Sequence, residues 1–459
     1  MTPKSSTTDA PGELTPRLAR KILNQMGENG KPPELGVSHV NVGNETYLHL
    51  IEKVYIEDLV QKADGSSFKL VQGTYGAGKT HFLFCVRDLA WHRNLLSAFV
   101  TISPKECALT KPLTVYQAVA RTIELARQSE DDDPVRGLDD ILRLRAEQTL
   151  AQDGRDQARR WIDASLGRAP IDRHSFRQAL VRYLHAVMEG AEDASRRLAA
   201  WLRGEAVPLE EAKLDGVYEA PSNENGFAML RSLVQAAHRL GYAGSLLLFD
   251  EGERRLSLEA TRSRSTSDAI DQLRELVDLC GRSELPRTLI LYAVTPAFTQ
   301  EILPVYPALQ QRLGSPIQYL SPHNPKAPLI DLEALDLDPP RLLEAVGERL
   351  AHVARVAYDF APPKRVVTGN LQKLVSTVTE EQLEVSHRRL FVKTWIRLLD
   401  DLRIGGLRVL APDEIEGLVR DEQMHLLVED EAERSNERLT FFGNPLKPSR
   451  TRGKTSEEK

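Results

Sequence analysis

The sequence predicts an α/β fold: a parallel five-stranded sheet covered by helices on both faces, with a helical insertion and a C-terminal helical lid. Short apolar runs alternate with helical patterns, and strands that are apolar throughout are typical of parallel sheets buried on both faces. Two stretches with charged helical periodicity lack a strand pattern and supply the insertion and the lid. The predicted strands are 68–72, 96–103, 245–253, 288–294 and 317–320.

The elements also predict where the chain divides. Residues 1–14 have the polar composition of a disordered tail. Thr15 and Pro16 fit the N-cap and first position of a helix, and a second helix is expected over 45–63. Helices are predicted after the strands, one of them over 115–126. The expected division is an N-terminal helical arm over 15–67, an α/β core over 68–330 with the helical insertion at about 128–215, a C-terminal helical lid over 331–430 and a flexible tail over 431–459.

Composition indicates a globular intracellular protein. The chain has 459 residues, enough for two or three domains, and its net charge of -6 gives no overall attraction to nucleic acid or anionic lipid. No run approaches the roughly 18 apolar residues of a membrane span, and the polar N-terminus lacks a signal peptide's apolar region. Cys85, Cys107 and Cys280 stand in apolar runs without a metal or disulfide spacing, so reduced core cysteines and a cytoplasmic location are expected.

A glycine-rich loop follows the first predicted strand and precedes a helix. It fits G-x-x-x-x-G-K-[ST] at every fixed position, which predicts a P-loop that binds the phosphates of ATP. Glycines let backbone N–H groups converge on phosphate, and the helix N-terminus adds positive potential. Lys79 is expected to reach the β- and γ-phosphates, and Thr80 to ligate Mg²⁺. The predicted nucleotide contacts are Gly73, Thr74, Tyr75, Gly76, Ala77, Gly78, Lys79, Thr80 and His81.

An acidic pair ends the third predicted strand. Asp250 follows four apolar residues and is expected to hold Mg²⁺, while the adjacent Glu251 suits a general base that polarises an attacking water. This pairing favours hydrolysis of ATP over phosphoryl transfer to a small molecule.

Three further residues are candidate catalytic or nucleotide-sensing groups. Thr295 ends the strand expected between the loop strand and the acidic strand, where it can orient the water, or it is an ordinary helix cap. Arg312 fits a trans-acting arginine finger or a solvated helix end. Arg388 and Arg389 open a lid helix; Arg389 is the predicted nucleotide contact, and a plain basic helix face is the alternative.

These parts in this order resemble an AAA+-type P-loop ATPase. More narrowly, the chain resembles the ATP-binding proteins of BREX phage-defence systems, the BrxD-like group, over about 15–405. The narrower resemblance depends on GKPPELGVSHVNVG, SSFKLVQGTYGAGKTHFL, ISPKECALTKPLTVYQA, GYAGSLLLFDEGE and RRLFVKTWIRLLDDL. It implies that Val42 and Gly43 lie against adenine and that Arg389 is the lid sensor. Gly252, directly after the acidic pair, departs from the expected pattern.

The sequence leaves several functions open. One is a motor or remodeller that hydrolyses ATP as a homo-oligomer, acting on DNA or partner proteins. Another is a nucleotide-gated scaffold that turns over rarely and recruits a helicase or another defence protein through the insertion. Direct DNA binding through the basic loop 261–265, with Arg262 and Arg264, is a third. A small-molecule kinase is a fourth, but the chain lacks a recognisable acceptor-site motif.

Overall fold

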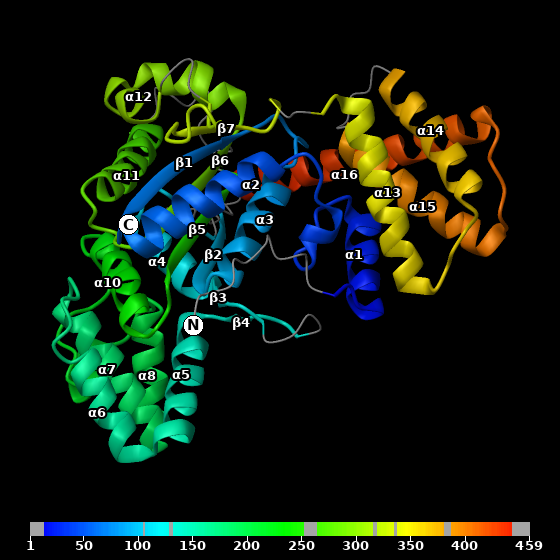
Figure 1. The fold of residues 1–459 in the computed structure, drawn as a ribbon. Coiled ribbons are helices and arrows are strands. Elements are labelled where there is room, and N and C mark those ends of the chain that lie inside the picture. The colour runs from blue at the N-terminus through cyan, green and yellow to red at the C-terminus, as the bar shows by residue number, and fades with distance from the viewer. Residues whose placement is uncertain are drawn as a thin grey trace, which may run out of the picture.

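The protein is a central sheet with helices on both faces, a helical group at one end and a second helical group beside the sheet (Figure 1). Within the described residues no helix has both the length and the apolar character to cross a membrane. The computed structural model describes residues 13–103, 106–127, 132–251, 264–314, 319–334, 337–380 and 387–442, without the side chains of 264–266 and 429–442.

The sheet has seven strands in the order β4-β3-β2-β5-β6-β1-β7. All neighbouring pairs from β2 to β7 are parallel, whereas β3 and β4 add an antiparallel edge. Strand β6, which Thr295 follows directly, lies between β1 and β5, as the sequence predicted. The bounds are β1 Ser66–Gln72, β2 Leu95–Thr101, β3 Ile123–Leu125, β4 Val135–Arg136, β5 Gly244–Asp250, β6 Thr288–Val294 and β7 Leu329–Asp331.

The prediction of five strands was therefore wrong in number and at one edge. The fifth parallel strand is β7, not 317–320; of that predicted strand, 317 and 318 lie outside the described residues, and Tyr319 forms an isolated bridge with Leu329. At the other edge, the helix predicted over 115–126 ends at Thr122, and the next three residues form β3.

Helices cover both faces of the sheet, as predicted. Side chains alternate along each strand, so Leu246 and Leu248 pack with the helices before and after the loop strand. Leu247 and Phe249 pack on the opposite face, against the helices that follow β2 and precede β5. The covering elements are α2 Glu45–Leu50, the π-helix Ile51–Lys62, α3 Lys79–His92, α4 Pro112–Thr122, α10 Gly226–Arg239, α11 Arg264–Gly281 and α12 Pro307–Leu313, with short turns Phe298–Ile302 and Leu303–Val305.

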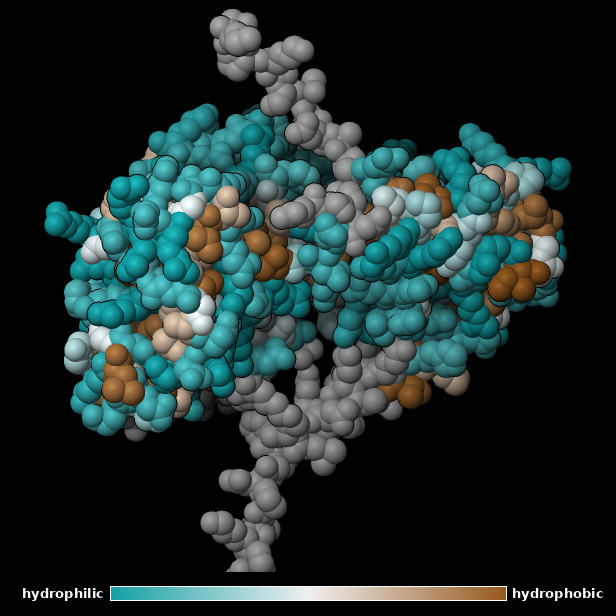
Figure 2. All heavy atoms as spheres, turned by 90° about the horizontal axis from the view of Figure 1, so that it is seen from below, coloured by the Kyte–Doolittle hydropathy of each residue, from teal (hydrophilic) through white to brown (hydrophobic). Residues whose placement is uncertain are grey.

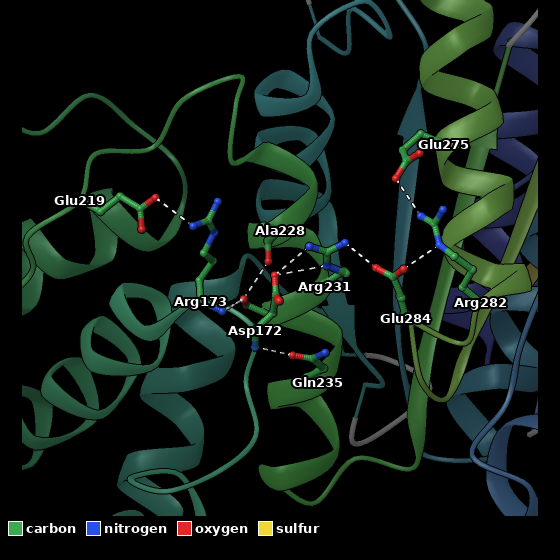
Figure 3. A network of polar contacts seen from close by, with 10 residues as sticks. Asp172, Arg173, Glu219, Ala228, Arg231, Gln235, Glu275, Arg282 and Glu284 are labelled. Atoms are coloured by element: carbon green, nitrogen blue, oxygen red, sulfur yellow. Dashed lines mark hydrogen bonds and ion pairs between the residues drawn. The ribbon is translucent and has the colours of Figure 1, made fainter.

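The helical group at one end comes from the region between β4 and α10. Its apolar side chains share one hydrophobic cluster with the second face of the sheet. A polar network also joins it to the core: Arg231 of α10 contacts Asp172 (3.0 Å) and Glu284 (2.6 Å), and Glu284 contacts Arg282 (2.6 Å; Figure 3). The helices are α5 Leu138–Asp153, α6 Arg155–Ser165, α7 His174–Glu189, α8 Glu192–Leu202 and α9 Leu209–Leu214.

The second helical group combines the two ends of the described chain. Helix α1 lies beside α13 (Figure 1) and buries Leu18 and Ile22 in the same cluster as the C-terminal helices. Thr15 caps α1 as predicted, because its side chain accepts a hydrogen bond from Leu18 N at 3.1 Å. We call this group the lid: α1 Pro16–Asn29, α13 Pro339–Tyr358, α14 Lys364–Glu380, α15 His387–Gly405 and α16 Pro412–Phe442.

Candidate functional site

A cleft of about 730 Å³ separates the carboxyl edge of the sheet from the lid. The face seen in Figure 2 is mostly hydrophilic and is hollowed between the core and the lid. Most of the lining comes from the glycine-rich loop with the acidic pair, from the segment 30–44 between α1 and α2, which we call the arm from here on, and from the lid helices α13 and α15. Helices α1 and α3, strand β2 and Glu106 complete it. In parallel sheets, ligands bind at this edge, where several strand ends converge.

The local geometry explains the glycines of the loop. Gly76 (φ 79°) and Gly78 (φ 93°) have left-handed backbones that residues with a Cβ adopt at a cost. A Cβ at Gly73 would lie 2.8 Å from the Cβ of Ala77, which is closer than carbon atoms can pack. The loop then enters α3 at Lys79, so the N-terminus of a 14-residue helix faces the cleft.

Lys79 folds back on its own loop. Its ammonium donates hydrogen bonds to the carbonyl oxygens of Gly73 (2.9 Å) and Thr74 (3.1 Å). On the other side of the loop, Glu333 accepts a hydrogen bond from Thr74 N at 2.8 Å. That hydrogen bond is the main reason why the pKa of Glu333 is lowered, and the nearby Arg388 and Lys79 lower it further. Glu333 follows β7 and precedes α13, and it was not predicted, because no motif marks it.

The acidic pair meets the loop. Asp250 accepts a hydrogen bond from the Thr80 hydroxyl (2.6 Å) through one oxygen and from Glu251 N (2.9 Å) through the other. Glu251 has a left-handed backbone (φ 61°), an unusual conformation that often marks functional positions. Among the described residues no group of three or more His, Cys, Asp or Glu could hold a metal. A hydroxyl beside a carboxylate fits Mg²⁺, which takes few protein ligands and completes its shell with phosphate and water.

Thr295 and Arg312 lie outside the residues that line this cleft. Thr295 stands directly after β6, and its carbonyl accepts a hydrogen bond from Phe298 N at 3.0 Å. Its neighbour Val294 accepts a hydrogen bond from Gly73 N at 3.2 Å, so Thr295 is close to the loop along the sheet edge. Arg312, on α12, is paired with Asp278 of α11.

The arm supplies an apolar part of the cleft, where the resemblance placed Val42 and Gly43. Val42 lines the cleft, and Gly43 beside it has a left-handed backbone (φ 85°). Next to Val42, Asn41 accepts a hydrogen bond from His81 at 3.1 Å. Sequence reasoning missed the other apolar residues here, because helix side chains that face a cleft and those that face a core share one pattern. They are Met26, Val40, Phe84, Phe99, Leu342, Leu343, Val346 and Val392.

Both lid arginines reach the loop. Arg388 donates a hydrogen bond to the Ala77 carbonyl, and a Cβ on Gly78 would lie 3.5 Å from its guanidinium. Arg389 contacts the side chain of Tyr75 (3.3 Å) and the Asn29 carbonyl (3.2 Å). Arg388 therefore lies closer than Arg389 to the glycines that would cradle phosphate. The predicted basic loop 261–265 lies outside the described residues except for the backbone of 264 and 265, and Gly252 lies outside them entirely.

A strand, a glycine-rich loop and a helix N-terminus, with an acidic strand end beside them, define the protein as a P-loop nucleotide-binding protein. Residues 14–404 match the family described as BREX system ATP-binding protein BrxC/D. The chain belongs to this family, which confirms the resemblance seen in the sequence. No curated protein and no solved structure matches the chain.

Proposed function

We propose that the protein hydrolyses ATP in this cleft as an AAA+-type ATPase of a BREX anti-phage system in the cytoplasm, acting on DNA or on partner proteins. The observation that carries this proposal is the contact of Thr80 with Asp250 at 2.6 Å, with Glu251 next in the chain and facing the same cleft. A binding site alone would not need the second carboxylate.

Each residue has a role that follows from its position. Lys79 leaves the loop carbonyls to neutralise the β- and γ-phosphates, and the backbone N–H groups of the loop hold the remaining phosphate oxygens. Thr80 and Asp250 would hold Mg²⁺, which when bound neutralises charge on the phosphates. Glu251 accepts the proton of the attacking water. Thr295 lies beside the loop but outside the lining, so it would orient that water only after the strand end moves toward the cleft. The guanidinium of Arg388 or Arg389 stabilises negative charge that develops on the phosphate.

The proposal extends to assembly. Arg312 is partly exposed on α12, away from its own cleft, where a neighbouring copy could receive it. In a homo-oligomer, or in a complex with another defence protein such as a helicase, Arg312 would leave its ion pair with Asp278 and contact the phosphate of the nucleotide in the adjacent subunit.

Steady-state ATP hydrolysis, with and without double-stranded DNA, tests the proposal. Glu251→Gln should keep ATP binding and lower turnover by about 10²- to 10⁴-fold, because it removes only the general base. Lys79→Ala should lose binding as well. Glu192→Gln, the same change at an exposed position of α8, is the matched control and should behave as wild type. Unchanged turnover in Glu251→Gln would contradict the proposed role of Glu251.

A nucleotide-gated scaffold is the second candidate, and the contacts of Arg388 and Arg389 with the loop favour it. These contacts connect the state of the loop directly to the lid. Tight ATP binding with negligible turnover under both conditions would support a scaffold over a motor. Deleting 128–215 would then abolish partner capture if the insertion is the docking surface.

A further inference from the structure

Arg87 is a buried cation of α3, the helix that begins at the glycine-rich loop, and only 2% of its side chain is exposed. Its guanidinium carbon lies 4.5 Å from the ring centroid of Phe84 and 4.6 Å from that of Trp91, so the two rings fix its direction. One terminal nitrogen donates a hydrogen bond to the Glu34 carbonyl in the arm. The other lies 3.5 Å from the carboxylate of Glu124 in β3.

Glu124 is as deeply buried as Arg87 and has a second cationic partner. Arg136, opposite it in the antiparallel edge of the sheet, pairs with its carboxylate at 2.5 Å. Arg136 also lies 3.6 Å from the carboxylate of Glu34. Glu34 is therefore held to the core twice, by Arg87 at its backbone carbonyl and by Arg136 at its side chain.

The same stretch of the arm is fixed to the lid by Gln25 of α1. The Gln25 side chain accepts a hydrogen bond from Glu34 N at 3.1 Å and donates one to the Pro32 carbonyl at 3.2 Å. Gln25, Pro32 and Glu34 all line the cleft. Arg87 thus completes a connection that runs from the lid, through the arm, to the helix that carries the loop.

Stability alone does not explain why Arg87 and Glu124 are buried. Moving two charges out of water costs about as much as their attraction returns, so packed apolar residues often replace such a pair without loss. Among the described residues, Nε of Arg87 is also sealed from water without a hydrogen-bond partner, which adds to the cost. An apolar side chain could replace the pair but could not donate to the Glu34 carbonyl. The particular contribution of Arg87 is therefore the position of the arm.

We propose that Arg87 is a positioning residue that holds the arm, and with it one wall of the cleft, against α3, while Glu124 holds Arg87 in place. Glu34 is exposed, so water can satisfy its carbonyl once the guanidinium is removed. The cleft then keeps the loop and the acidic pair but loses the fixed position of the wall that the arm supplies. This inference rests on the proposed function, since it concerns how the same cleft is shaped for the nucleotide.

The double variant Arg87→Met/Glu124→Leu tests the assignment, because it removes both charges and leaves neither buried without the other. Its denaturant midpoint should stay close to that of the wild type. KM for ATP should rise about tenfold, the size of one lost hydrogen bond, while kcat changes by less than about twofold. Without nucleotide, hydrogen exchange should speed up about tenfold in 34–42 and stay unchanged in β2 and β5.

Two further variants separate the position of the arm from general effects on the fold. Arg197→Met/Asp215→Leu is the matched control, because it removes a guanidinium–carboxylate pair of the insertion, joined at 2.9 Å, that does not line the cleft. Its KM and its exchange in 34–42 should equal those of the wild type. Arg87→Lys keeps a cation beside Glu124 but lacks the second terminal nitrogen that reaches Glu34. It should therefore raise KM and speed exchange in 34–42 even if the apolar pair does not fold.

Wild-type KM and wild-type exchange of the arm in Arg87→Lys or in the double variant would overturn the inference. A loss in kcat as large as the rise in KM would also overturn it, because a residue that only positions the arm leaves the chemical step intact. If the wild type binds no ATP, the proposed function fails. The exchange measurement, which uses no nucleotide, then still decides whether Arg87 holds the arm.

Discussion

At the scale of single residues, the site is held by competing hydrogen bonds that a nucleotide would replace. Lys79 lies on loop carbonyls, Thr80 on Asp250, and Glu333 on Thr74 N. The contacts of Lys79 and Thr80 satisfy groups that, in the proposed function, would face phosphate or metal. Binding therefore exchanges one set of charge-assisted hydrogen bonds for another, and the net affinity depends on how well the phosphates satisfy the same groups.

The two lid arginines differ enough in position for their roles to be separated. Arg388 contacts the Ala77 carbonyl within the loop, whereas Arg389 contacts the Tyr75 hydroxyl and Asn29 at the rim. We expect Arg388→Ala to lower kcat for ATP at least about tenfold, because it removes a cation beside the developing charge. Arg389→Ala should change kcat by less than about threefold, as for an exposed polar contact.

Steady-state kinetics of the two single variants, with Arg388→Lys as the conservative control, would measure the difference. A larger loss in Arg389→Ala would reverse the assignment and return the sensing role to the residue that the sequence favoured.

At the scale of elements, Lys69 gives strand β1 a titratable group in its interior. Its side chain is buried; the ammonium donates to the carbonyls of Lys326 (3.2 Å) and Ala327 (2.8 Å) and lies over the ring of Tyr55. These contacts join β1 to the segment that leads into β7. Burial lowers the pKa of Lys69 to about 7.

This depressed pKa predicts how stability depends on pH. Between about pH 7 and the ordinary lysine pKa of 10.5, the unfolded chain binds a proton that the folded chain does not. The free energy of unfolding should therefore rise with pH through this window, and the full penalty applies below it. Relative to Lys69→Met, the free energy of unfolding of the wild type should increase by about 1 kcal/mol per pH unit. Denaturant unfolding of both proteins between pH 7 and 9 measures this increase. If the free energies of unfolding of the two proteins changed with pH by the same amount, Lys69 would be charged in the folded protein.

Elements with a long apolar run or a motif were predictable, and short ones fixed by distant contacts were not. Strands β1, β2, β5 and β6 each have seven residues and were predicted to within three residues at either end. Strand β3 has three residues and continues a helical pattern. Its Glu124 is buried against Arg87 of α3, at 3.5 Å. That ion pair joins residues far apart in the chain, so no local pattern reveals the strand.

The same distinction holds for the site. The loop, Asp250 and Glu251 were predictable, because phosphate and Mg²⁺ chemistry requires those residue types at a fixed spacing. The apolar lining from α13 and α15 was not, because it reaches the cleft only through the placement of the lid. Glu333 was not either, because its contact with Thr74 N joins residues far apart in the chain.

At the scale of the whole molecule, the lid and the core are joined along the cleft itself. Helix α1 belongs to the lid, and the chain then runs past the cleft as the arm before it enters the core. Both sides hold the arm at Glu34: its N–H donates to Gln25 of α1 at 3.1 Å, and its carbonyl accepts from Arg87 of α3. Helix α3 starts at the loop, so a shift at the loop reaches the arm directly.

This arrangement predicts that nucleotide binding orders the lid as well as the loop. With a non-hydrolysable ATP analogue and Mg²⁺, hydrogen exchange should slow by about tenfold in 76–81 and in α15, which corresponds to about 1.4 kcal/mol of local stability. Arg388→Ala should keep the protection in 76–81 and lose it in α15, because the loop binds phosphate by itself and the guanidinium carries the signal to the lid. Arg408→Ala, which breaks an exposed lid ion pair with Glu414, is the matched control and should keep both. Equal protection of α15 in Arg388→Ala and wild type would mean that the arm, and not the arginine, couples the nucleotide to the lid.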